Sequence, residues 1–120
     1  MKRKHHELHV WQEATALVKE VYRITASFPK EELYALTTQM RRAAVSIPSN
    51  IAEGAARNGN KEFVQFLSIA RGFLSELETQ LLIAHCLGYL KDNNDVLNRI
   101  EHVFALLGGL INSLRKRIKG

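Results

Sequence analysis

The chain has 120 residues, of which 46% are hydrophobic and 24% are charged, and its formal net charge is +5. These values are typical of one globular domain, residues 1–120, and exclude a disordered or a fibrous chain. No apolar run approaches the roughly 18 residues of a membrane span, and the basic start lacks the apolar core of a signal peptide, so we expect a cytoplasmic protein with no membrane partner.

The first predicted helix spans residues 9–26. Its apolar residues recur at steps of three or four, which places them on one face that can pack in a core. The pattern breaks at Ser27-Phe28-Pro29, because proline disfavours helical geometry in the residue before it. The predicted core face consists of Val10, Ala14, Leu17, Val21 and Ile24, with Trp11 and Val18 beside it.

The second predicted helix begins at Pro29, where Glu31 and Glu32 suit the positive end of the helix dipole. It contains the sequence QMRRAAVSIPSNIAEG at residues 39–54, in which an apolar stripe and a polar stripe run side by side. The apolar stripe consists of Met40, Ala44, Ile47, Ile51 and Ala55. The polar stripe consists of Gln39, Arg42, Ser46, Asn50, Glu53 and Arg57.

Pro48 lies inside this second helix. An interior proline removes one backbone donor and costs about 3 kcal/mol, so we predict a kink, with Ser46, Ser49 or a water bonding to the carbonyl of Ala44. The alternative is that Pro48 ends one helix and Ser49 caps the next. The apolar stripe continues in phase across Pro48, which favours a single kinked helix.

Residues 57–60 predict a turn, because Gly59 can adopt positive φ and Asn60 can cap a helix. The third predicted helix runs from this turn to about Leu90, and we expect Cys86 to be a small core residue within it. Two apolar stripes follow this helix, about 100° apart. The first consists of Phe63, Leu67, Ala70, Leu74, Leu77, Leu81 and Ala84. The second consists of Phe66, Ile69, Phe73, Gln80, Ile83 and Leu87.

The second stripe indicates either a very wide core contact or a subunit interface, since a monomer rarely leaves a large apolar surface in water. We favour an oligomer interface that includes Phe66, Ile69 and Phe73.

The last turn is predicted at residues 91–95 and the fourth helix at 96–119. Gly108 and Gly109 weaken this helix by about 1 kcal/mol each, and we expect close helix approach to compensate. Short connections between four helices predict an all-α, antiparallel up-and-down four-helix bundle. The predicted core face consists of Leu97, Ile100, Phe104, Leu107, Ile111, Leu114 and Ile118, broadened by Val103 and Leu110.

No catalytic motif accompanies these helices. The phosphate-binding loop, the nucleophile elbow and the zinc-protease helix are all missing, and Ser46 has no histidine near it in sequence, so we expect neither an enzyme nor a cofactor. A metal hypothesis arises for His5, His6 and His9, because imidazoles four residues apart on a helix can share an ion. It requires a helix back to His5, where a frayed basic segment is expected, and we assign no metal site.

Basic residues are concentrated at the two ends of the chain. Seven of the 17 lie there, whereas the remaining ten are opposed by 12 acidic residues, so the body is mildly acidic. Such tails attract polyanions, although they can also serve solubility alone. The tail cations are Lys2, Arg3, Lys4, Arg115, Lys116, Arg117 and Lys119.

Several sequence blocks resemble one family. RRAAVSIPSNIAEG, with WQEA upstream, ELYALTTQ just before it and ELETQLLIAHCLGYL downstream, is similar to the four-helix-bundle proteins encoded by intervening sequences in bacterial 23S ribosomal RNA genes. The resemblance covers about Leu8 to Leu114 and implies an up-and-down bundle that forms a ring-like homopentamer. Related accessory proteins of diversity-generating retroelements work with a reverse transcriptase and RNA through a basic surface, so the resemblance implies RNA, DNA or a reverse transcriptase as partners.

We therefore predict a non-enzymatic homo-oligomer that binds the backbone of nucleic acids or acts as a scaffold. Phosphate would be contacted by Arg41, Arg42, Arg57 and the tail cations. The supporting motif consists of Ser46, Pro48, Asn50, Glu53 and Gly54. The alternative is a purely structural protein-interaction module, in which Arg41 and Arg42 pair with Glu53, with Glu31 or with a carboxylate of a neighbouring subunit.

Overall fold

Four α-helices account for most of the computed structural model, which describes residues 3–92 and 94–119. They are α1 (His9–Thr25), α2 (Leu36–Ala55), α3 (Asn60–Cys86) and α4 (Asn94–Lys119). Two single-turn 3-10 helices, η1 (Lys4–Glu7) and η2 (Lys30–Glu32), precede α1 and α2. These ranges contain no strand, so the predicted all-α class is confirmed. Within them, no helix combines the length and the apolar character needed to cross a lipid bilayer.

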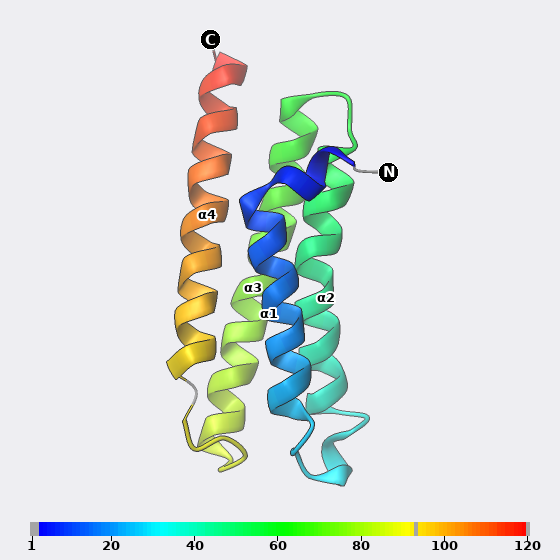
Figure 1. Cartoon of the computed structure of the whole chain (residues 1–120), viewed down its shortest axis with the longest axis vertical. Coiled ribbons are helices and arrows are strands. Elements are labelled where there is room, and N and C mark those ends of the chain that lie inside the picture. Colours follow the sequence, from blue (N-terminus) through cyan, green and yellow to red (C-terminus); the bar gives the residue numbers. More distant parts are fainter. Residues whose placement is uncertain (1–2, 93, 120) are drawn as a thin grey trace.

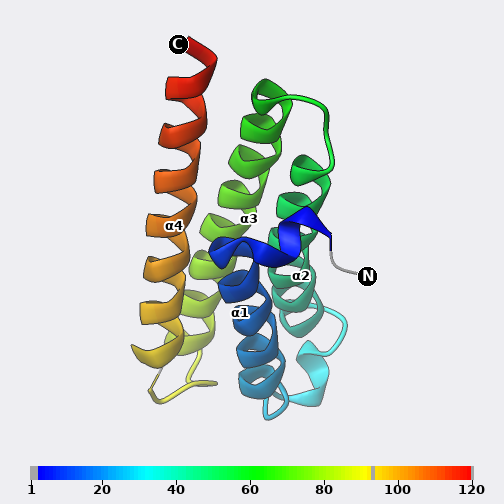
Figure 2. The ribbon, with the colours of Figure 1, turned by 45° about the horizontal axis from the view of Figure 1, so that its top comes forward.

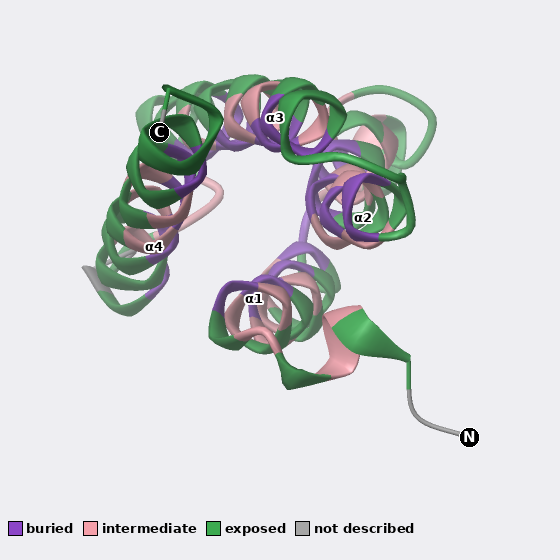
Figure 3. Cartoon of the chain, turned by 90° about the horizontal axis from the view of Figure 1, so that it is seen from above, coloured by how far each residue is buried: buried purple, intermediate pink, exposed green. Residues whose placement is uncertain are grey.

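The helices stand side by side, and each contacts two neighbours. The closest backbone approaches join α1 to α2, α2 to α3, α3 to α4 and α4 to α1, whereas the described residues of the diagonal pairs make no backbone approach of this kind (Figure 3). The colours of Figure 1 run downward along α1 and α3 and upward along α2 and α4, and Figure 2 shows the same course. One end of the molecule therefore gathers the start of α1, the end of α2, the start of α3 and the end of α4.

The apolar stripes predicted for the first two helices line the core. Met40, Ala44, Ile47 and Ile51 of α2 are fully buried, and the seam of α1 is buried from Val10 to Val21. Figure 3 shows the buried residues on the faces that the helices turn toward one another. Each fully buried large aliphatic side chain contributes about 1.5–3 kcal/mol relative to an exposed one, so these stripes supply the main force that holds the bundle together.

The second helix begins later than predicted, and at Pro48 it is a single helix, as predicted, whereas the kink stays a prediction. It continues unbroken through Pro48, so the alternative of two separate helices is wrong. It begins at Leu36, whereas Pro29 precedes only η2. Tertiary contacts explain the late start: Phe28 is buried, with its ring 5.5 Å from that of Tyr89, and the Tyr89 hydroxyl donates to Glu32 Oε2 at 2.7 Å. That hydrogen bond also raises the pKa of Tyr89.

The third helix ends earlier than predicted, at Cys86. Gly88 adopts φ +82°, and the backbone N–H of Tyr89 donates to the carbonyl of Ala84 at 3.0 Å, which closes the helix with a left-handed glycine. Cys86 is exposed, so the prediction of a core cysteine is wrong. Gln80 is also misplaced by the prediction, since it is buried rather than part of an outward stripe, and its Nε2 donates to Glu76 Oε2 at 3.1 Å.

In the predicted core face of the fourth helix, Ile100, Leu107, Ile111 and Leu114 are buried, Leu97 and Phe104 are half-buried, and Ile118 is exposed. The close approach expected at Gly108 and Gly109 does not occur, because a Cβ at either position would meet nothing within 4 Å. Gly54 of α2 makes the close approach instead. A Cβ there would lie 2.7 Å from the Cβ of Phe66 and 2.9 Å from Cδ1 of Phe63, both on α3.

Replacing Gly54 should therefore separate α2 from α3. We expect Gly54→Ala to lower the free energy of unfolding by about 1–3 kcal/mol, because the added methyl group meets a Cβ that cannot move without its backbone. Gly109→Ala is the matched control, and it should raise stability by up to about 1 kcal/mol through helix propensity alone. Urea unfolding followed by circular dichroism measures both values, and a stability gain in both variants would contradict the close approach.

Candidate nucleic-acid interface

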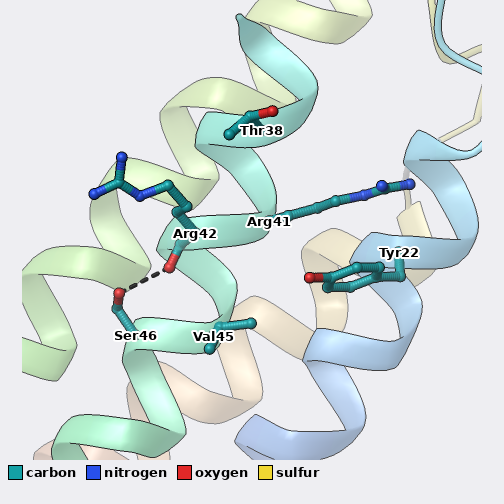
Figure 4. A pocket seen from close by; sticks show the side chains of 6 residues that line it. All are labelled: Tyr22, Thr38, Arg41, Arg42, Val45 and Ser46. Atoms are coloured by element: carbon teal, nitrogen blue, oxygen red, sulfur yellow. Dashed lines mark hydrogen bonds between the residues drawn. The ribbon is translucent and has the colours of Figure 1, made fainter. Parts of the chain in front are cut away.

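Arg41 reaches from α2 toward α1 and is held there. Its guanidinium carbon lies 4.6 Å from the centre of the Tyr22 ring, and its Nε donates to Thr25 Oγ1 at 2.9 Å (Figure 4). Thr25 is buried and its hydroxyl in turn donates to the carbonyl of Val21 at 2.7 Å. A cation over an aromatic ring contributes about 0.5–1 kcal/mol at an exposed site. Arg41 is thus a brace between two helices as well as a surface cation.

Arg42 extends from the opposite side of the same turn (Figure 4). Its guanidinium is exposed, and no ion pair joins it to another residue in 3–92 or 94–119. The predicted pairing of Arg41 and Arg42 with Glu31 or Glu53 is therefore not found within one chain. Pairing with a carboxylate of another subunit stays a prediction.

Two open pockets meet at Arg42. The first has a volume of about 440 Å³ and lies toward α1, where Figure 4 shows its lining. The second, about 360 Å³, lies toward α3 and includes Glu76, which brings a negative charge to that side. The first is lined by Tyr22, Thr38, Arg41, Arg42, Val45 and Ser46, and the second by Gln39, Arg42, Ala43, Ser46, Phe73 and Glu76.

The polar groups around Pro48 bond back to their own helix. The hydroxyl of Ser46 donates to the carbonyl of Arg42, that of Ser49 to Val45, and Nδ2 of Asn50 to Ser46, at 2.8, 2.8 and 2.7 Å. Neither serine bonds to the carbonyl of Ala44, so Ser46 and Ser49 are wrong as substitutes for the bond lost at Pro48, and a water in that place stays a prediction. Such bonds satisfy side chains within a helix, and they support a structural role for Ser46 and Asn50.

Arg57 lies two residues past the end of α2, against Phe66 of α3. Its Nη2 donates to Glu53 Oε1 at 3.0 Å, and its guanidinium carbon lies 4.9 Å from the centre of the Phe66 ring. The ion pair is exposed on both sides, so it adds little to stability. It does offset part of the charge that Arg57 would offer to a phosphate.

The two sets of predicted phosphate contacts do not come together. Arg42 and Arg57 are 15 residues apart on one helical course, which corresponds to about 22 Å at 1.5 Å per residue. Arg57 is grouped with the chain ends, because the end of α2 contacts η1 and lies at the same end of the molecule as the last turns of α4 (Figure 1). The predicted site thus divides into an isolated pair, Arg41 and Arg42, and a second group at one end of the bundle.

We call this second group the basic end and define it as residues 3–7, 53–62 and 115–119. It contains eight basic and three acidic residues, whereas residues 23–32 and 85–95 at the opposite end contain three basic and four acidic ones. Desolvation, with the charges of His6 and Arg3, lowers the pKa of His5, which disfavours the charged form of this imidazole. The cations of the basic end are Arg3, Lys4, Arg57, Lys61, Arg115, Lys116, Arg117 and Lys119. Lys2 lies outside the described residues.

The last turns of α4 carry half of these cations. Arg115, Lys116, Arg117 and Lys119 are exposed and form no ion pair with any residue whose position the structure describes. They follow Leu114, the last buried residue that the structure describes, so they extend beyond the core into solvent. This part of the molecule can approach a polyanion without unfolding.

The three residues predicted for an oligomer interface differ in exposure. Ile69 is 47% exposed, whereas Phe66 and Phe73 are half-buried within one chain. Phe66 packs against Gly54 and Arg57, and Phe73 packs against the core. Ile69 is therefore the member most available to another subunit, and Ile83 and Leu87 are similarly exposed further along α3.

His5, His6 and His9 do not share one helix face, as the metal hypothesis required. Leu8 has extended backbone between η1 and α1, so His5 and His9 do not share a helix face. His5 and His6 pack instead against Trp11, each with its ring centre 5.1 Å from the indole. His9 lies beside His102 of α4, at 5.7 Å between ring centres. Because these two residues lie on different helices, no spacing in the sequence predicts their contact.

Comparison with known proteins adds one finding. A family model described as 23S rRNA-intervening sequence protein matches residues 6–109, which is most of the chain. A search of curated proteins gives no match. The matched range covers the first three helices and most of α4, so it includes Arg41, Arg42 and Arg57 but not the basic residues 115–119.

Arg41 and Arg42 have different surroundings, so replacing them should change the free energy of unfolding by different amounts. Arg41→Ala should lower the free energy of unfolding by about 1–2 kcal/mol, because it removes the contact with Tyr22 and the hydrogen bond to Thr25. Arg42→Ala should change it by less than about 0.5 kcal/mol, as at other exposed positions. Denaturant unfolding of both variants is the measurement, and equal losses would show that Arg41 is not a brace.

Proposed function

The chain belongs to the 23S rRNA-intervening sequence protein family, and on that basis we propose that it is a non-enzymatic, homo-oligomeric four-helix bundle that binds the phosphate backbone of RNA or DNA. The observation that carries the proposal is the basic end, with its eight basic and three acidic residues. Neutralising phosphates releases condensed counterions, so a concentration of lysine and arginine favours binding at low salt without reading sequence.

The up-and-down topology is part of this proposal. An antiparallel order is supported by the course of the colours in Figures 1 and 2 and by the short connection between α2 and α3 at residues 56–59. It is this order that gathers η1, the α2–α3 turn and the last turns of α4 at one end. Cations from distant parts of the sequence then act on the same ligand.

Oligomerisation would multiply the charge of the basic end. We propose the homopentamer that the family resemblance implies, assembled partly through the exposed apolar residues of α3, with Ile69 at its centre. In a ring of five, the four cations of residues 115–119 become about 20. The absence of base-stacking aromatics among the residues of the basic end favours contacts to phosphate rather than to bases.

A non-enzymatic role is supported by the arrangement of the polar stripe on α2. Ser46 and Asn50, its candidate reactive groups, bond to carbonyls of the same helix. A nucleophile requires a base within hydrogen-bond reach and a group that orients the base. The hydroxyl of Ser46 donates to a carbonyl instead.

The second candidate function is a protein-interaction module centred on Arg42. The observation that favours it is the combination of the unpaired Arg42 with exposed apolar side chains, since Tyr22 is 44% and Val45 41% exposed beside it. Arginine and aromatic residues are enriched where proteins bind one another. A reverse transcriptase or another protein partner would dock on this face, away from the basic end.

The salt dependence of binding can show whether nucleic acid binds at the basic end or responds only to the net charge of the protein. We expect the triple variant Lys116→Gln/Arg117→Gln/Lys119→Gln to bind structured RNA and duplex DNA more weakly, and to lower the slope of log affinity against log salt by about 2–3 for DNA. Fluorescence anisotropy across a salt series measures both quantities. The control, Lys19→Gln/Lys30→Gln/Lys91→Gln, removes the same charge elsewhere and should retain most of the affinity and slope. Equal losses in the two variants would refute a localised site.

Assembly can be tested independently of nucleic acid. Ile69→Glu should reduce the particle mass toward that of one chain, because a buried, unpaired carboxylate is costly at an apolar interface. Gln65→Glu, on the same exposed face one turn earlier, is the matched control and should remain assembled. Light scattering coupled to size-exclusion chromatography gives the mass. An unchanged mass in Ile69→Glu would exclude this part of α3 from the interface.

A further inference from the structure

Two histidines and a glutamate meet where the first helix packs against the last. Nε2 of His9 lies 3.9 Å from Glu13 Oε1, and Nε2 of His102 lies 3.8 Å from the same oxygen. The ligand atoms that the three residues offer all lie within 4.8 Å of one another. His9 and Glu13 come from α1 and His102 comes from α4.

We propose that His9, Glu13 and His102 bind a divalent transition metal of the zinc class between α1 and α4. Zinc takes histidine nitrogen and carboxylate oxygen at about 2.0–2.2 Å, which places ligand atoms in a tetrahedral site roughly 3.3–3.5 Å apart. The two nitrogen–oxygen separations of 3.9 and 3.8 Å are therefore within about half an ångström of that geometry. All three ligand atoms lie within 4.8 Å of one another, so binding an ion would require the exposed imidazoles to rotate toward it.

The helical framework places these ligands without distortion. Residues four apart lie on the same face of a helix, so His9 and Glu13 project together from α1. α4 supplies the third ligand from a different direction, which a tetrahedral ion requires. Three protein ligands leave a fourth position for water, as in zinc sites of the open type.

The second oxygen of Glu13 has its own partner. Arg99 Nη1 lies 3.7 Å from Glu13 Oε2, whereas both imidazoles approach Oε1. Partners that hold the non-ligating oxygen of a carboxylate orient the ligating one and are part of many metal sites.

A metal at this position would link the first helix to the last. Residues 9 and 102 lie on the first and last helices, so the ion would join them only in the folded chain. Anything that binds the folded state alone raises its apparent stability with concentration. The site is separate from the basic end, and neither proposal depends on the other.

The test uses the untagged, full-length chain after removal of metals by a chelator. Isothermal titration with Zn²⁺ should show one ion per chain, and Co²⁺ should give the visible absorption of a tetrahedral complex. His102→Ala and Glu13→Gln should each weaken Zn²⁺ binding at least about tenfold. In the unmodified chain the midpoint of thermal unfolding should rise with Zn²⁺, and His102→Ala should show no such rise.

The control is His5→Ala/His6→Ala, which removes the other histidine pair near the same helix. It should retain the affinity, the stoichiometry and the thermal shift. Loss of Zn²⁺ binding in this control, or full affinity in His102→Ala, would overturn the assignment, as would failure of the unmodified chain to bind Zn²⁺ saturably. All substituted side chains are exposed or half-buried, so circular dichroism of the variants should match that of the unmodified chain.

Discussion

The close approach of α2 to α3 at Gly54 is the constraint on which the arrangement of this molecule depends. A side chain there would lie 2.7 Å from the Cβ of Phe66, so only glycine permits the observed packing. The same contact places the Phe66 ring under Arg57 at the end of α2. With the apolar stripe of α2 fixed inward, the opposite face presents Arg42 to solvent. Core packing thus determines which cations are available at the surface.

Hydrophobic periodicity predicted the helices and their buried faces, because burial of one stripe is a local property of the sequence. It predicted helix ends less well, since these depend on contacts between distant residues. The start of α2 follows from Phe28 and Glu32 contacting Tyr89, more than 50 residues away. The end of α3 could have been predicted, because Gly88 is the residue that favours a left-handed helix terminus. Cys86 lies within α3, as predicted, but it follows Ala84, the last buried residue of that helix, and is exposed.

The candidate sites, like the helices, were predictable only where they depend on local sequence. The sequence located the basic tails, but their convergence with Arg57 and Lys61 follows from the order of the helices (Figure 1). The brace at Arg41 requires Thr25 and Tyr22 from another helix, which no spacing predicts. The contact of His9 with His102 joins residues at opposite ends of the sequence. Stripes within one helix are visible in a sequence, whereas sites built between helices need the packing that brings them together.

The central claim is that nucleic acid is bound at one end of the bundle, and lysines at both ends allow that claim to be tested in a single protein. The most direct measurement is mass-spectrometric footprinting of lysine acetylation, with and without RNA, on the unmodified protein. We predict protection of Lys4, Lys61, Lys116 and Lys119, with no change at Lys30 and Lys91 on the opposite end. Uniform protection of both groups, or none under conditions where RNA binds, would contradict the account.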